Sequence, residues 1–297
     1  MLEKIKSRLP GGYYFNGLCS ALLNLLKKGR LTIKDKYIFL TYFIGAGNGY
    51  CILTIYNYLT RLYSKNDYLD LYGIKIPKLN TFEEKSALVT QFLDFVFPYF
   101  SNDYSNIIGE GPYLYDEVKI NTSDIVIDAG ANMGMFSALA SRLGAIVYAF
   151  EPIEKIREKY LKRTVSLNSN INIIPLALSN KKEDAIFMKG GSVSASMISK
   201  FQSSDDISEE VSTITLDDWV KQNNIPKVDF IKADIEGAER LMLEGAQWVL
   251  KTYAPKLAIC TYHLPDDKEV LTKLILQANP DYKIEYAWKK LYAWIEK

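Results

Sequence analysis

The feature that most constrains the fold is an alternation of short apolar runs with helical patterns, which begins at residue 124. Examples of the apolar runs are "DIVID" at 124–128, "AIVYAF" at 145–150 and "VDFIKA" at 228–233. Short strands that alternate with helices form a parallel sheet covered on both faces. The last two apolar runs, 282–288 and 290–296, are joined by a tight turn and predict an antiparallel edge.

Residues 1–105 predict a mainly helical accessory region, followed by a sheet-containing domain at 106–297. Within this region, residues 82–100 read as an amphipathic helix that ends near Pro98, because proline cannot continue a helix. The large apolar content must be buried. We therefore expect residues 1–105 to form a helical cover or a homodimer contact.

Tyr37–Thr60 contains no charged residue and is long enough to span a bilayer. Its middle, "GAGNGY" at 45–50, favours a bend over a continuous helix, so membrane association is not expected. The same glycines could form a ligand loop, but no second strand ending in an acid follows at a suitable distance. We interpret "GAGNGY" as a turn or helix break.

The charge balance and the cysteines indicate which kinds of binding partner and which cellular compartment to expect. The chain has 36 Lys and Arg against 35 Asp and Glu, a net charge of +1 that argues against a nucleic-acid binder. The three cysteines form no CxxC pair, which is typical of free thiols in a reducing compartment. We expect a cytoplasmic protein.

A second glycine-rich stretch, "DAGANMG" at 128–134, directly follows the first strand of the predicted sheet. In such sheets the ligand lies beyond the carboxyl ends of the strands. Gly130 and Gly134 let the backbone turn and approach a ligand. Asp128 disfavours a pyrophosphate and suits a cationic ligand such as S-adenosylmethionine. Glu151 ends the next strand and can accept both ribose hydroxyls.

Three segments together resemble the FkbM-type S-adenosylmethionine-dependent methyltransferases. They are "EGPYLYDEVKINTSDIVIDAGANMGMFSALA", "YAFEP" and "VDFIKADIEGAE", and the likeness runs from about Ile107 to the end. It implies a Rossmann-like class I methyltransferase fold with a seven-stranded, mostly parallel sheet. It also implies methyl transfer to a hydroxyl of a small-molecule acceptor, namely a sugar, a nucleotide-sugar or a natural product. The motif positions carried over are Asp128, Gly130, Asn132 and Gly134 for the donor loop, Glu151 for the ribose, and Lys232, Asp234 and Glu236 for the acidic motif.

The chemistry needs the acceptor aimed at the methyl group and its proton removed. The catalytic candidates include Lys232 and Asp234, which lie on the same side of one strand, and Glu236, which begins the following loop. Asp234 or Glu236 could face the sulfonium of the donor or the acceptor hydroxyl. His263, the one histidine of the chain, ends a neighbouring strand and is a candidate general base. The alternatives are structural: a Lys232–Asp234 ion pair that fixes the strand end, and a histidine held in a turn.

Asp234, Glu236 and His263 could also hold a divalent metal, but no resident metal is expected, because one histidine and scattered acids are not a specific signature. The predicted function is O-methylation by S-adenosylmethionine. An N-methyltransferase on the same fold and a donor-binding, non-catalytic subunit of a partner complex remain alternatives.

Overall fold

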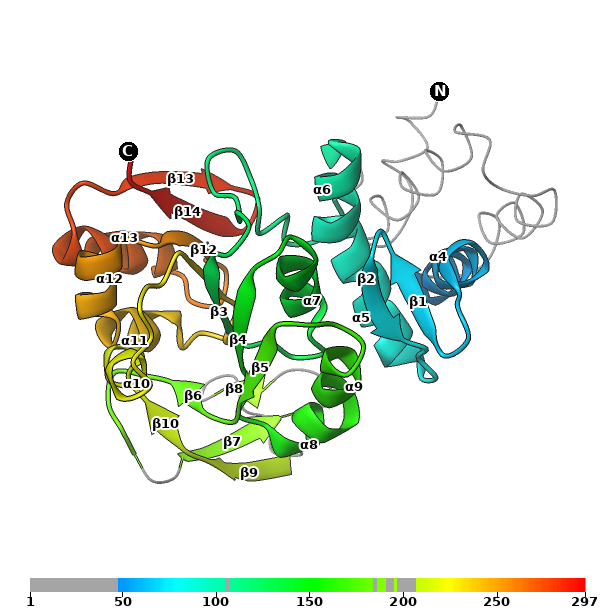
Figure 1. The fold of residues 1–297 in the computed structure, drawn as a ribbon, viewed down its shortest axis with the longest axis horizontal. Helices are drawn as coiled ribbons and strands as arrows, with labels where there is room; N and C mark the ends of the chain where they lie inside the picture. The colour runs from blue at the N-terminus through cyan, green and yellow to red at the C-terminus, as the bar shows by residue number, and fades with distance from the viewer. Residues whose placement is uncertain (1–47, 105–106, 184–185, 191–194, 197–206, 297) are drawn as a thin grey trace. The chain divides into compact units, whose positions relative to one another are not determined.

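The computed structural model describes residues 48–104, 107–183, 186–190, 195–196 and 207–296 (Figure 1). The chain divides into two compact units. The first is made of Met1–Tyr72 and Pro77–Pro112, and the second of Gly73–Ile76 and Tyr113–Lys297.

The described part of the first unit is mainly helical, as predicted for the N-terminal region. Its elements are α4 (Asn48–Tyr63), β1 (Tyr68–Leu71), α5 (Phe82–Gln91), the π-helical turn η1 (Phe92–Val96) and α6 (Phe97–Ser101). A capping box starts α5: the Thr81 hydroxyl accepts from the backbone N–H of Glu84, and the Glu84 carboxylate accepts from that of Thr81. This pair satisfies donors that the first helical turn would otherwise leave unpaired.

The helix predicted to end near Pro98 continues to Ser101, so that prediction is wrong. The physical reason is the π-helical turn η1. The backbone N–H of Phe97 donates to the carbonyl of Phe92, five residues back. This wider turn starts a new helical segment, and Pro98 falls in its first turn, where a missing N–H is tolerated.

Three expectations concern the start of the chain. Asn48, Gly49 and Tyr50 of "GAGNGY" are the first residues of α4, and residues 45–47 lie outside the described part. In the stretches that the structure describes, no helix combines the length and the apolar character needed to cross a bilayer. The predicted cover or dimer contact of residues 1–105 involves residues 1–47, which also lie outside the described part.

The second unit contains the predicted sheet of seven strands. Their order is β13-β14-β12-β11-β3-β4-β5. All neighbours are parallel except β14, which runs antiparallel to β12 and β13, so the antiparallel edge is confirmed. The strands are β3 (Ile125–Ala129), β4 (Ile146–Phe150), β5 (Ile171–Ile174), β11 (Phe230–Ala233), β12 (Lys256–Cys260), β13 (Lys283–Ala287) and β14 (Lys290–Trp294).

Helices cover both faces of this sheet, which gives the α/β, Rossmann-like arrangement that was predicted (Figure 1). On one side lie α7 (Met135–Arg142), α8 (Glu154–Ile156), the π-helical turn η3 (Arg157–Leu161) and α9 (Lys162–Val165). On the other side lie α10 (Leu216–Gln222), α11 (Glu239–Glu244), α12 (Gln247–Tyr253) and α13 (Asp267–Ala278).

Short strands complete the structure. A three-stranded antiparallel sheet has the order β8-β7-β9, and β6 pairs with β10 in parallel. The bounds are β2 (Ile74–Pro77), β6 (Ala177–Leu178), β7 (Ile186–Gly190), β8 (Ala195–Ser196), β9 (Ile207–Val211) and β10 (Thr213–Ile214).

The sheet order reverses between β3 and β11, and this reversal positions the candidate site. The chain proceeds outward from β3 to β4 and β5, then returns to add β11 on the opposite side of β3. The sheet and helices bury a contiguous core that includes Ile127, Phe150, Trp219, Ile231 and Leu257. Crevices that accept ligands form at such a reversal, beyond the carboxyl ends of the strands.

Candidate active site

At the reversal point, a buried ion pair joins the two central strands. The parallel register of β3 and β11 sets Asp128 beside Lys232. Lys232 Nζ lies 3.0 Å from Asp128 Oδ1, and the two side chains are 5% and 0% exposed. A buried charge needs a partner of this kind, because leaving either ion alone would be strongly destabilising.

Lys232 also holds the loop that follows β3. Its ammonium donates to the carbonyl oxygens of Ala129, at 3.1 Å, and Gly130, at 2.7 Å. Burial lowers the pKa of Lys232, but the charges of Asp128 and Asp234 outweigh burial and raise it above its ordinary value. With Asp128, three acceptors surround the three N–H donors of a charged lysine. This geometry favours a structural role for Lys232 over the catalytic one considered from the sequence.

Asp128 is likewise used inside the protein. Its Oδ2 accepts a 2.6 Å hydrogen bond from the hydroxyl of Ser137 in α7, while Oδ1 pairs with Lys232. The expected direct contact between Asp128 and a cationic ligand is therefore not what this geometry favours. Asp128 instead connects β3, β11 and the start of α7. The Asp128–Lys232 pair also replaces the Lys232–Asp234 pair that was the structural alternative.

The loop after β3 requires unusual backbone angles, as its glycines predict. Gly130, Asn132 and Gly134 have φ values of 74°, 51° and 84°. A Cβ at position 130 would lie 2.1 Å from the carbonyl oxygen of Asp234, a distance that backbone atoms cannot tolerate. Glycine at 130 therefore lets this loop pass against the end of β11, and asparagine is one of the few other residues that adopt such angles.

Glu151 lies directly after β4 and holds the same loop from the other side. Its two carboxylate oxygens accept from the backbone N–H groups of Asn132 and Ile153, each at 3.0 Å. The residue is only 5% exposed. Burial raises the pKa of Glu151 to about 7, against the opposing effect of these two hydrogen bonds. A buried acid with such a pKa is a marker of a functional site.

A second group of side chains lies beyond β11 and β12, and we call it the carboxylate–histidine cluster: Asp234, Glu236, Glu239 and His263. Glu239 Oε1 lies 3.1 Å from His263 Nδ1. On the other side of the ring, Glu236 Oε2 and Asp234 Oδ1 lie 3.4 and 3.8 Å from Nε2. Glu236 adopts a φ of 55°, a strained conformation for a residue that is not glycine.

The carboxylates determine the charge of His263. Burial lowers the pKa of His263, whereas hydrogen bonds to Glu236 and Glu239 and the charge of Asp234 raise it, to about 10 overall. An imidazole that is protonated at neutral pH has no free lone pair with which to accept a proton. The general-base role considered for His263 is therefore not favoured by this geometry.

Two tyrosine hydroxyls lie close to the partly exposed carboxylate of Asp234. The hydroxyl of Tyr113 donates to its Oδ2 at 2.8 Å, and the hydroxyl of Tyr262 lies 3.5 Å from Oδ1. Burial raises the pKa of Asp234, but the charges of Lys232, Lys290 and His263 and the Tyr113 hydrogen bond lower it overall. Asp234 is therefore an ionised carboxylate, and its side chain is 24% exposed.

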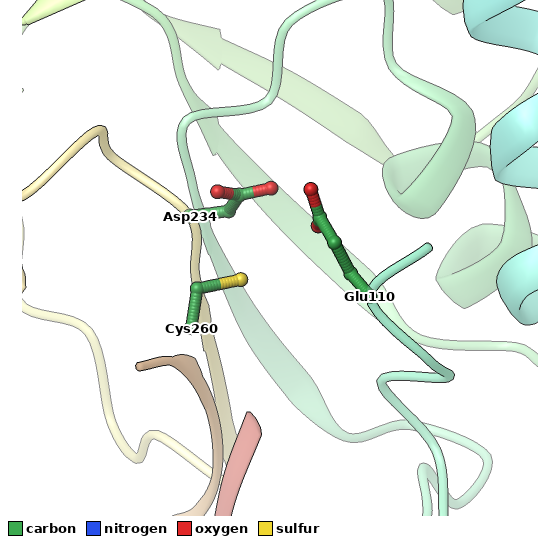
Figure 2. A group of neighbouring side chains, drawn as sticks. All are labelled: Glu110, Asp234 and Cys260. Carbon is green, nitrogen blue, oxygen red and sulfur yellow. The ribbon is translucent and has the colours of Figure 1, made fainter. Parts of the chain in front are cut away.

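The structure brings most of the sequence-predicted residues into these two neighbouring groups. Figure 2 shows the carboxylate of Asp234 and the thiol of Cys260 pointing to the same side of β11 and β12; the third labelled residue, Glu110, belongs to the other compact unit. One set of ligand atoms, from Asp234, Glu239 and His263, lies within 4.8 Å of one another and could hold a metal ion.

Sequence reasoning missed Glu239 and Tyr113. Glu239 ends the quoted motif "VDFIKADIEGAE", and its place at the start of a helix after two other acids was a usable signal. Tyr113 lies 121 positions from the aspartate that it contacts, and nothing in the local sequence points to that contact.

Two curated proteins and one solved structure are similar to this chain. Hexuronic acid methyltransferase AglP of Haloferax volcanii is 26% identical over 156 residues, which cover 52% of this chain and 63% of that protein. The 31-O-demethyl-FK506 methyltransferase FkbM of Streptomyces tacrolimicus is 25% identical over 205 residues, covering 59% of this chain and 75% of that protein. A crystal structure of methyltransferase FkbM from Methylobacillus flagellatus KT superposes with a TM-score of 0.46 and 20% identity, covering 82% of this chain and 59% of that one.

The family comparison covers the elements that build the site. The model of the methyltransferase FkbM domain matches residues 128–285, more than half of the chain, from Asp128 at the end of β3 into β13. This range contains the loop after β3, Glu151 and the whole carboxylate–histidine cluster. The chain belongs to the FkbM methyltransferase family.

Proposed function

We propose that this chain transfers a methyl group from S-adenosylmethionine to a hydroxyl of a small-molecule acceptor. The observation that carries the proposal is Glu151, a buried carboxylate beside a tightly turned glycine loop at the reversal point of the sheet. A carboxylate in that position accepts hydrogen bonds from the two hydroxyls of a ribose. The loop from Gly130 to Gly134 would lie along the rest of the donor.

Glu151 keeps acceptor capacity for such a ligand. Each carboxylate oxygen has two lone pairs and receives one backbone N–H in the structure. Donor hydroxyls can therefore add to the existing hydrogen bonds without breaking the contact with Asn132. The loop would therefore already have its binding conformation before the donor arrives. Such preorganisation reduces the conformational entropy that is lost on binding.

The carboxylate–histidine cluster is our candidate for the acceptor side. It lies beyond β11 and β12, next to the strand end that carries the donor loop. In the reaction, the bond between the methyl carbon and the sulfonium sulfur breaks, a bond from that carbon to the acceptor oxygen forms, and the hydroxyl proton would leave by way of Asp234 to solvent. The ionised Asp234 would accept the hydrogen bond of the acceptor hydroxyl and aim its oxygen at the methyl group.

The acceptor class is proposed from the relatives. One of them is named for a hexuronic acid and another for 31-O-demethyl-FK506, and both names describe methyltransferases. We therefore propose a sugar or a hydroxylated natural product as the acceptor. An amine acceptor would require a neutral nitrogen, and a panel of acceptors distinguishes the two.

Two measurements test the proposal. Calorimetry with S-adenosylhomocysteine is done above the pKa of Glu151, which is about 7, so that the carboxylate is ionised. It should give one site on the wild type and an affinity at least about tenfold weaker for Glu151→Ala, because a hydrogen bond to a charged group contributes about 1.5–3 kcal/mol. Glu154→Ala, an exposed glutamate three residues away, is the matched control.

For the second measurement, labelled donor is supplied with uronic acids, neutral sugars and amines in parallel. Unchanged affinity in a folded Glu151→Ala protein would reject the donor site, and transfer only to amines would reject O-methylation.

A further inference from the structure

We propose that Asp234, Glu239 and His263 form a binding site for one divalent cation. Their ligand atoms lie within 4.8 Å of one another. All three belong to the second compact unit and come from the loop after β11, the first residue of α11 and the segment after β12. The cation's chemical role rests on the proposed methyl transfer, whereas its binding does not.

The arrangement around His263 matches a common way of building metal sites. A histidine binds a metal through one ring nitrogen, while the other is held by a carboxylate or a carbonyl that fixes the orientation of the ring. Here carboxylates face both nitrogens, with Glu239 at 3.1 Å from Nδ1 and Glu236 and Asp234 at 3.4 and 3.8 Å from Nε2. Binding through Nδ1 would displace the proton that this nitrogen carries. Glu236 would then remain beside Nε2 to orient the ring.

Glu239 supplies an independent observation. It is fully buried, and its Oε1 accepts a 2.8 Å hydrogen bond from the backbone N–H of Ile235. Its buried Oε2 has no hydrogen-bond partner within the described residues. A buried acceptor without a partner is costly, and a bound cation would satisfy it.

The other carboxylates leave one side of the site open. The side chains of Asp234 and Glu236 are 24% and 37% exposed, whereas those of Glu239 and His263 are 0% and 4% exposed. An ion bound here would be held from the protein side by buried ligands and would keep positions for water on the solvent side. Open positions of this kind distinguish catalytic metal sites from structural ones.

The ligand types indicate which ions to test. One imidazole nitrogen with carboxylate oxygens suits Mn²⁺, Fe²⁺ and Zn²⁺. If the acceptor hydroxyl replaces a bound water, the ion lowers the pKa of that hydroxyl, as it does for water. The proton would leave to solvent, and the metal-held oxygen would take the methyl group from the sulfonium sulfur.

Direct binding measurements on the full chain test the site without any assay of activity. The chelator-treated protein is titrated with Mn²⁺, the free ion being followed by electron paramagnetic resonance, and with Zn²⁺ by calorimetry. We expect one saturable site on the wild type. Asp234→Asn and His263→Gln should each weaken binding by at least about tenfold, a typical cost of altering a metal site. Glu269→Gln, an exposed acid of α13, should bind as the wild type does.

S-adenosylhomocysteine binding to the same samples separates this proposal from the proposed function. If neither ion binds, or if both variants bind like the control, the cation site is rejected while a retained donor site stands. If the ion binds with the expected pattern but the donor product does not, the cation site stands and the methyltransferase proposal fails. Circular dichroism of each variant establishes that it is folded, and Asp234, being partly exposed, is the safer of the two substitutions.

Discussion

At the scale of single residues, the site contains two kinds of buried ionisable group: an ion pair, and a carboxyl group without a charged hydrogen-bond partner among the described residues. Asp128 and Lys232 neutralise each other, and each has additional hydrogen bonds. Among the described residues, the carboxylate of Glu151 accepts hydrogen bonds from backbone N–H groups alone, and burial raises the pKa of this carboxyl group to about 7. The first pair stabilises the strand ends, whereas Glu151 keeps unused acceptor capacity, which agrees with the proposed donor site.

The raised pKa of Glu151 predicts a pH dependence of stability. Its ordinary pKa is 4.5, so between about pH 4.5 and 7 the folded chain holds the proton more tightly than the unfolded chain. This group's contribution to the free energy of unfolding therefore falls as pH rises through that window, by up to about 3 kcal/mol at 1.36 kcal/mol per pKa unit. Urea unfolding of wild type and Glu151→Gln at several pH values measures it, and the variant should lose this part of the slope. Parallel slopes for the two proteins would contradict the assignment.

Removing Lys232 tests the buried ion pair. Lys232→Met leaves Asp128 buried with an unpaired charge, so we expect a loss of about 3–5 kcal/mol in the free energy of unfolding. Lys227→Met is the control, because Lys227 pairs with Asp229 at the surface and such pairs contribute about 0–1 kcal/mol. Denaturant unfolding of both variants gives the comparison. Equal losses would show that the pair has no special part in holding the strand ends.

At the scale of elements, the sheet and the loop after β3 were predictable because their signals are local. Short apolar runs, turn glycines and the acid at 151 each occupy a few consecutive residues. The Asp128–Lys232 pair was not predictable, since it depends on the register of strands that lie 104 positions apart. The continuation of a helix through Pro98 depends on a π-helical turn that has no simple sequence pattern.

The loop after β3 should be intolerant of a side chain at position 130. Gly130→Ala places a Cβ at φ 74° and 2.1 Å from the backbone of Asp234, so the loop must move and the contact with Glu151 must loosen. We expect affinity for S-adenosylhomocysteine to fall by more than about tenfold, because a misplaced loop loses several contacts together. Gly144→Ala is the control, since Gly144 also has a positive φ, 91°, but lies beyond α7. A similar loss of affinity in both variants would attribute the effect to general strain.

At the scale of the whole molecule, the balance of acidic and basic residues indicates which class of acceptor the chain can bind. The fold alone does not identify this class. The net charge is +1, from 36 basic and 35 acidic residues, and both groups of the candidate site contain more carboxylates than lysines. A protein that binds nucleic acid neutralises several phosphates with lysine and arginine and releases counterions. The charge balance and the carboxylates beyond β11 and β12 disfavour a polyanionic acceptor there.

We therefore predict that the chain does not bind nucleic acid as an acceptor. Fluorescence anisotropy of a labelled RNA, at about 50 and about 200 mM NaCl, should show no saturable binding at the higher salt. A binder that makes 6–10 phosphate contacts would instead lose about 10³–10⁵ in affinity between these two conditions. Methyl transfer to a small hydroxylated acceptor should change little over the same range, because short-range contacts in a partly buried site are weakly screened. Tight RNA binding with a steep salt dependence would overturn the small-molecule assignment, even if the donor site behaves as proposed.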